Sequence, residues 1–290
     1  MSDGHPVPDG PGRDGSEHDV PGNDTAGRDA SGTVLELTGL SRAFGSLTAV
    51  DAVSLRVRAG ARHALIGPNG AGKSTLFNLV AGTLRATAGR IVFRGRDVTA
   101  MPEHRRARLG LSRTFQHASV FSSGTALDNV LTALHGRTGQ GWSMGRAALR
   151  RRARVERSMR ALDQVGLADA GQRIAGELSH GGRRQLELAM ALVADPVLLL
   201  LDEPAAGISP GDTERLATIL TGLPADVTVL LIEHDLDLVF DVADTVTVLH
   251  LGRQLRTGDP AEIRAAEDVR TAYLGAASVE ELFPSTDAAT

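Results

Sequence analysis

The feature that most restricts the fold of this chain is the stretch GPNGAGKST at residues 67–75. It matches the pattern G-x-x-x-x-G-K-[ST] at every required position. A short apolar run at His63–Ile66 precedes the stretch, and residues 76–81 after it are apolar at helical spacing. This pattern needs a strand, a tight loop and a helix in that order, so the sequence predicts an α/β fold.

The residue types of this stretch indicate phosphate binding. Glycines let the loop fold back so that backbone N–H groups point at phosphate oxygens, and the following helix adds the positive end of its dipole. Lys73, the only lysine in the chain, can reach the β- and γ-phosphates, and the Ser74 hydroxyl can bind Mg²⁺. The predicted phosphate-binding residues are Gly67, Pro68, Asn69, Gly70, Ala71, Gly72, Lys73, Ser74 and Thr75.

Composition excludes several classes of protein. The chain has 290 residues, a net charge of −4 and no cysteine, so disulfides and thiolate metal sites are ruled out. The charge and the isoelectric point near 6.1 argue against a nucleic-acid binder. The sequence contains no apolar run of the roughly 18 residues that a membrane span needs, and no secretory signal is recognisable at the N-terminus.

The pattern along the chain predicts three parts. Residues 1–32 are rich in Gly, Asp and Pro, and we expect a disordered tail. Between the tails, strands are expected before the phosphate loop, and the helical pattern from Val120 to about Val165 predicts a separate helical subdomain. One helix is predicted from Pro260 to about Leu274, and residues 281–290 form a C-terminal tail.

Four arginines at residues 146, 150, 154 and 157 fall on one face of a predicted helix within the helical block. A solvated face is the ordinary interpretation of such a run. Contact with a partner or with anionic lipid headgroups is the alternative.

Polar side chains follow two further apolar strands. Val197–Leu201 is followed by Asp202 and Glu203, where ligands bind in doubly wound folds. Asp202 would complete the Mg²⁺ site, and Glu203 could hold the attacking water as a base. The apolar run 227–232 leads to His234, which is a candidate contact for the γ-phosphate. Elsewhere in the chain, Ser179 could cap a helix over about 182–194.

The order of these motifs resembles the nucleotide-binding subunit of ABC transporters, over about residues 33–280. The signature-like Leu178-Ser179-His180-Gly181, some twenty residues before Asp202, separates this family from other nucleotide hydrolases. The resemblance implies one nucleotide-binding domain over residues 33–280. Its expected parts are a P-loop NTPase (RecA-like) core, an antiparallel β subdomain and an α-helical signature subdomain at about 117–195. It also implies an ATPase that uses ATP and Mg²⁺ and whose hydrolysis is coupled to transmembrane transport.

The resemblance further implies a role for each matching residue. Asp202 matches the Mg²⁺-associated acid, Glu203 the general base and His234 the switch histidine. Gln116 matches the glutamine that senses Mg²⁺ and water and couples to the membrane partner, and Phe44 matches the aromatic that stacks on adenine. In this family the residues equivalent to Ser179 and Gly181 bind the γ-phosphate of ATP that is held by the opposite subunit.

Partners and location follow from the same resemblance. We expect integral membrane permease subunits, a second ABC ATPase subunit and, indirectly, an extracytoplasmic substrate-binding protein, without nucleic acid. The expected place is the cytoplasmic face of the cell membrane, as a peripheral subunit. The stretches Arg113–Gln116, Ala205–Gly207 and Ala272–Gly275 look like the importer type for branched-chain amino acids, so import of these or of polar amino acids is expected.

The alternatives within the family are a urea or amide importer and an exporter of the lipopolysaccharide type. A soluble ABC-type ATPase acting on ribosomes or DNA usually carries two cassettes or a long coiled-coil insertion, and the sequence shows neither. A cassette that binds ATP without turnover is disfavoured because every hydrolytic residue is present. His180 and Gly182 depart from the usual Leu-Ser-Gly-Gly-Gln signature, and Ser209 stands where many members carry Asp or Asn.

Overall fold

The computed structural model describes residues 32–114, 120–138 and 147–273, together with Met1. Its strands form two sheets, one of four strands in the order β2-β1-β4-β5 and one of six in the order β10-β9-β3-β8-β7-β6. The four-stranded sheet is antiparallel and consists of β1 (Thr33–Phe44), β2 (Leu47–Arg58), β4 (Ala88–Phe93) and β5 (Arg96–Asp97).

The six-stranded sheet is parallel except for its last hairpin, β9–β10. The neighbouring strands β7 and β8 are buried along their whole length, as expected for parallel strands covered on both faces. The strands are β3 (Arg62–Ile66), β6 (Leu111–Arg113), β7 (Leu198–Asp202), β8 (Thr228–Ile232), β9 (Thr245–His250) and β10 (Arg253–Gly258).

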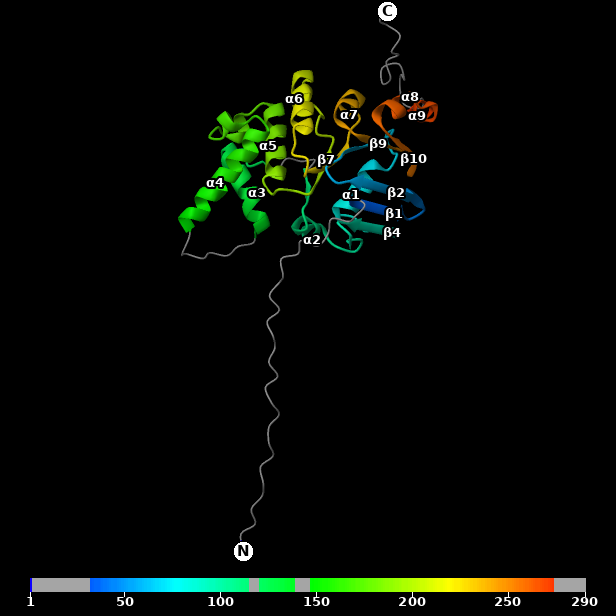
Figure 1. The fold of residues 1–290 in the computed structure, drawn as a ribbon, viewed down its shortest axis with the longest axis horizontal. Coiled ribbons are helices and arrows are strands. Elements are labelled where there is room, and N and C mark those ends of the chain that lie inside the picture. The colour runs from blue at the N-terminus through cyan, green and yellow to red at the C-terminus, as the bar shows by residue number, and fades with distance from the viewer. Residues whose placement is uncertain (2–31, 115–119, 139–146, 274–290) are drawn as a thin grey trace, which may run out of the picture.

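Helices cover both faces of the six-stranded sheet. Helix α1 (Lys73–Ala81) packs through Leu76 and Phe77 into a core shared with the antiparallel sheet. A second core joins α3 (Ala126–Thr138), α4 (Ala147–Gln164), α5 (His180–Leu192) and α6 (Pro210–Thr221) to the other face, and Figure 1 shows these helices grouped away from α1. The remaining helices are α2 (Glu103–Arg108), α7 (Leu236–Val242), α8 (Pro260–Ala265) and α9 (Glu267–Tyr273).

The single helix predicted from Pro260 to about Leu274 is wrong. The structure has α8 and α9 instead, separated at Ala266, whose backbone is extended with φ −71° and ψ 122°. Arg256 of β10 donates two hydrogen bonds from Nε and Nη2 to the Asp268 carboxylate at the start of α9. This contact holds α9 against the sheet, in a direction different from that of α8. The helical periodicity of the sequence could not predict this contact.

None of the helices that the structure describes is long and apolar enough to cross a membrane. The predicted Arg-rich helical face is only partly described, because the side chains of residues 146 and 150 lie outside the described set. Of the other two, Arg157 bonds the Val193 carbonyl at 2.6 Å and Arg154 contacts the His135 ring at 2.6 Å. Both of these arginines therefore have partners within the helical group.

Candidate functional site

Three parallel strands deliver the candidate residues to one edge of the sheet. Strand β3 leads into the phosphate loop, β7 ends at Asp202, and β8 leads to His234. The register pairs Leu65 of β3 with Ile232 of β8, and Ile232 with Asp202 of β7. The carboxyl ends of these strands therefore lie side by side, as the sequence predicted for this edge.

The phosphate loop is held in a conformation that requires glycine at two positions. Gly67 and Gly72 have φ values of 147° and 98°, which side chains rarely adopt. A Cβ atom at Gly67 would collide with the Leu249 carbonyl oxygen, and one at Gly72 with that of Ala49. The loop is therefore clamped between the backbones of β9 and β2, with Gly72 directly before the first turn of α1.

Lys73 and Ser74 open helix α1 beneath this loop. Lys73 is buried, and its ammonium donates hydrogen bonds to the carbonyl oxygens of Gly67 and Pro68. Burial lowers the pKa of Lys73, while Glu203 and Asp202 act in the opposite direction. Because of its two hydrogen bonds, the Lys73 ammonium lies against the carbonyl groups of the loop, whereas Ser74 is exposed.

Asp202 provides one free oxygen at the bottom of the site. Its Oδ2 accepts a hydrogen bond of 3.1 Å from Arg113, whose other terminal nitrogen donates to Asn78 at 2.8 Å. Its Oδ1 is buried and has no hydrogen-bond partner in the described part of the chain. Burial raises the pKa of Asp202, and Arg113 opposes this rise. A buried carboxylate oxygen without a partner suits an oxygen-preferring cation such as Mg²⁺ or one of its waters.

The described residues contain no cluster of three acidic or histidine side chains that could hold a metal by themselves. Such sparse protein ligation fits Mg²⁺, which is usually bound by one or two protein groups together with substrate phosphates and water. Ser74 and Asp202 are the described candidates for this role. Gln116, the third predicted metal-associated residue, lies outside the described residues.

Glu203 occupies an unusual backbone conformation beside this oxygen. Its φ of 49° lies in the left-handed region, which is uncommon for a residue with a side chain. Its N–H donates to the Ile232 carbonyl at 2.9 Å, which ties the turn after β7 to the end of β8. The Glu203 side chain is half-buried, and that of His234 is 63% exposed, so both can face a ligand.

Phe44 lies at the end of β1 and is 45% exposed. The Arg42 guanidinium carbon lies 4.4 Å from the centroid of its ring, within cation–π range. An exposed aromatic ring of this kind offers a stacking surface for a planar base.

Ser179 and Gly181 stand apart from this edge, at the start of α5. Ser179 caps the helix as predicted, with its hydroxyl accepting from the Gly182 N–H at 3.1 Å. A Cβ at Gly181 would collide with the Asp212 carboxylate of α6. Figure 1 places α5 with α3, α4 and α6, whereas α1 lies on the side of the antiparallel sheet. The structure therefore gathers the loop, Asp202, Glu203 and His234, but leaves the signature-like residues apart from them, with Ser179 exposed and Gly181 buried.

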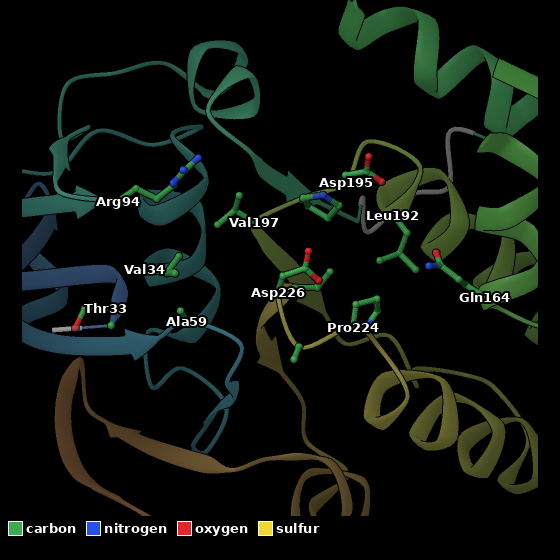
Figure 2. A pocket seen from close by; sticks show the side chains of 14 residues that line it. Thr33, Val34, Ala59, Arg94, Gln164, Leu192, Asp195, Val197, Pro224 and Asp226 are labelled. Atoms are coloured by element: carbon green, nitrogen blue, oxygen red, sulfur yellow. The ribbon is translucent and has the colours of Figure 1, made fainter. Parts of the chain in front are cut away.

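A cleft of about 760 Å³ lies at the other end of these strands, away from the phosphate loop (Figure 2). Val197 and Val227, which precede β7 and β8, line it together with Thr33, Arg94 and Gln164. It therefore lies at the amino ends of the strands whose carboxyl ends carry the phosphate loop and Asp202. None of the predicted site residues lines this cleft.

Two residues that the structure brings to the site carry no chemical role that the sequence pattern predicts. Arg113 pairs with Asp202, and Glu233 is fully buried beside His234. The available signal was a charged residue at the end of β6 and another directly after the buried strand β8. It could not reveal the partners, which lie 89 and 28 positions away along the chain.

The family model described as "ABC transporter" matches residues 50–206. The chain is 40% identical over 251 residues to the high-affinity branched-chain amino acid transport ATP-binding protein BraF of Pseudomonas aeruginosa, with 84% of this chain and 98% of the relative covered. It is 39% identical to LivG of Escherichia coli K12, a protein of the same description, with the same coverage. The chain therefore belongs to the ABC transporter family, as one of its ATP-binding cassettes.

Comparison with solved structures leads to the same class. The ADP-bound form of MJ1267, an ATP-binding cassette of an ABC transporter, superposes with a TM-score of 0.74 and 30% identity, covering 84% of this chain and 99% of MJ1267. The dimeric cassette MJ0796 has a TM-score of 0.67 at 21% identity, which supports the fold alone. The predictions of a P-loop NTPase fold and of an ABC-type ATPase are confirmed.

Proposed function

We propose that this chain is the ATP-hydrolysing subunit that powers import of branched-chain or polar amino acids through separate membrane subunits. The observation that carries the proposal is the convergence of Lys73, Asp202 and Glu203 at one edge of the sheet, in a chain 40% identical to BraF. The chain is 32% identical over 244 residues to the lipopolysaccharide export system ATP-binding protein LptB of Haemophilus influenzae. This identity is lower than that to BraF, so the export alternative has less support than amino acid import.

In the proposed reaction the loop amides and Lys73 hold the phosphates of ATP, and Phe44 stacks on adenine. Ser74, Asp202 and Gln116 would hold Mg²⁺, which neutralises charge on the β- and γ-phosphate oxygens when bound. Glu203 orients the attacking water and accepts its proton, and His234 contacts the γ-phosphate. A second cassette contributes its own Ser179 and Gly181 to the γ-phosphate, so two ATP molecules lie between two subunits.

The subunit is proposed to act at the cytoplasmic face of the cell membrane, bound peripherally to permease subunits. An extracytoplasmic binding protein would supply the substrate to those permeases. We propose that residues 33–280 form the cassette, with a helical signature subdomain at about 117–195 and tails at 1–32 and 281–290.

Transport tests this proposal directly. Cells that lack their own branched-chain amino acid ATPases are supplied with this chain and its permeases, and uptake of labelled leucine is compared with that of urea. The wild type should restore leucine uptake, whereas Glu203→Gln should not. Restored urea uptake alone would favour the amide importer, and recovery of the chain with ribosomes instead of membranes would contradict a transporter role.

A further inference from the structure

Glu233 is a buried acidic residue that the scheme above leaves without a role. It directly follows β8, and its side chain is completely inaccessible to solvent. A buried carboxylate is strongly unfavourable unless hydrogen bonds satisfy it. Its partners therefore explain why an acidic residue stands at this position.

The partners of Glu233 are backbone N–H groups from two different loops. Its Oε1 accepts from Ala205 at 2.7 Å, in the loop after β7. Its Oε2 accepts from His234 at 3.0 Å and, at a longer 3.4 Å, from Asp235, both in the loop after β8. Burial raises the pKa of Glu233, and the three N–H donors oppose the rise. Because all three partners are donors, the ionised carboxylate is the form that satisfies them.

The loop that this carboxylate holds contains the strained residue Glu203. A left-handed backbone at a residue other than glycine persists only where the surroundings enforce it. Two hydrogen bonds enforce this backbone conformation. The N–H of Glu203 itself donates to the Ile232 carbonyl, and the N–H of Ala205, two residues later, donates to the Glu233 carboxylate. Both acceptors come from the end of β8. The turn that presents Glu203 is therefore fastened to the segment that presents His234.

We propose that Glu233 is a positioning residue that holds the turn of Glu203 and the backbone of His234 in one fixed geometry. One side chain reaches both loops, so it sets the two groups relative to each other. The inference rests on the proposed hydrolytic function. If Glu233 only stabilised the fold, its substitution would instead reduce stability and nucleotide binding as much as turnover.

The kinetic test compares Glu233→Gln, Glu233→Asp and the control Glu36→Gln in the full chain. Gln puts an NH₂ group against N–H donors, and Asp keeps the charge but is too short to reach both loops. We expect each Glu233 variant to lower kcat by about 10- to 100-fold, while the KM and the dissociation constant for ATP change by less than about threefold. Glu36 pairs with Arg56 on the antiparallel sheet, away from Glu203 and His234, so Glu36→Gln should match the wild type.

The structural test needs no activity. Hydrogen exchange of the nucleotide-free protein should be faster for the peptide containing Ala205 in both Glu233 variants, with peptides from β7 and β8 unchanged. Unchanged kcat in Glu233→Gln, or unchanged exchange at Ala205, would overturn the inference. A parallel loss of ATP binding and turnover would also overturn it, because it indicates an anchor of the fold alone. If Glu233→Gln does not fold, Glu233→Asp decides by the same criteria.

Failure of the proposed function is distinguishable from failure of this inference. If the wild type and Glu203→Gln hydrolyse ATP equally, Glu203 is not the base and the proposed mechanism fails. The exchange measurement still decides whether Glu233 holds the two loops together.

Discussion

At the scale of single residues, the pair of Arg113 and Asp202 shows how a buried charge is kept in the site. Their side chains are 13% and 2% exposed and lie 3.1 Å apart. Arg113→Ala leaves the Asp202 carboxylate without its cation, so we expect a loss of about 3 kcal/mol of unfolding free energy in urea at pH 7. The exposed pair of Arg90 and Asp97 provides the control, because Arg90→Ala should lose less than about 1 kcal/mol. Equal losses in the two variants would contradict a structural role of the buried pair.

Lys73 permits a chemical test of the phosphate site, because it is the only lysine in the chain. An amine-reactive ester can therefore modify only Lys73 and the amino terminus. With Mg²⁺–ATP at ten times its dissociation constant, labelling of Lys73 should slow about tenfold, whereas the amino terminus should react as before. Mass spectrometry measures both rates, and equal labelling with and without ATP would place the nucleotide elsewhere.

At the scale of elements, strand β3 carries a buried histidine directly before the phosphate loop. His63 is 1% exposed and lies 2.9 Å from the Thr247 hydroxyl of β9. Burial lowers its pKa to about 4, from an ordinary value of 6.5. As the pH falls, the unfolded chain therefore takes up this proton before the folded protein does. The stability that His63 provides is complete above pH 6.5 and is lost as the pH falls towards 4.

This difference in pKa predicts a measurable slope. Between pH 7 and pH 4 the wild type should lose about 3 kcal/mol more unfolding free energy than His63→Gln, which keeps a hydrogen-bonding side chain that does not titrate. Urea unfolding across this pH range measures both proteins. Parallel pH profiles would show that His63 does not lose its proton on folding.

In the whole molecule, α5 lies apart from α1, and under the proposed function the ATP site therefore depends on a second cassette. Under the proposed function, Gly181→Ala in the Glu203→Gln background should bind ATP normally but fail to dimerise, because the new methyl group meets the Asp212 carboxylate. Gly211→Ala is the matched control, since a Cβ there meets no atom within 4 Å. Sedimentation with Mg²⁺–ATP distinguishes monomer from dimer. Dimers of the Gly181 variant would argue against the proposed part of this glycine.

Local patterns predicted a large share of this fold. The phosphate loop between strand and helix, the buried strands β7 and β8, and the Ser179 cap of α5 all follow from residues that are close in sequence. The prediction of a single helix after Pro260 was wrong because Arg256 of β10, which lies before both helices, holds Asp268 at the start of α9. Gln116 stays a prediction outside the described residues, and the roles of the other site residues await the experiments above.

Local sequence is enough to predict which residues form the phosphate loop, which strands are buried and which polar residues follow them. These properties depend on neighbours within a few positions, through backbone conformation and the periodicity of apolar side chains. The pairing of Arg113 with Asp202, and that of Glu233 with the turn of Glu203, depends instead on how the strands are arranged in the folded sheet. The sheet order β10-β9-β3-β8-β7-β6 rearranges the chain order, so the partners of a buried charge are set by which strands become neighbours.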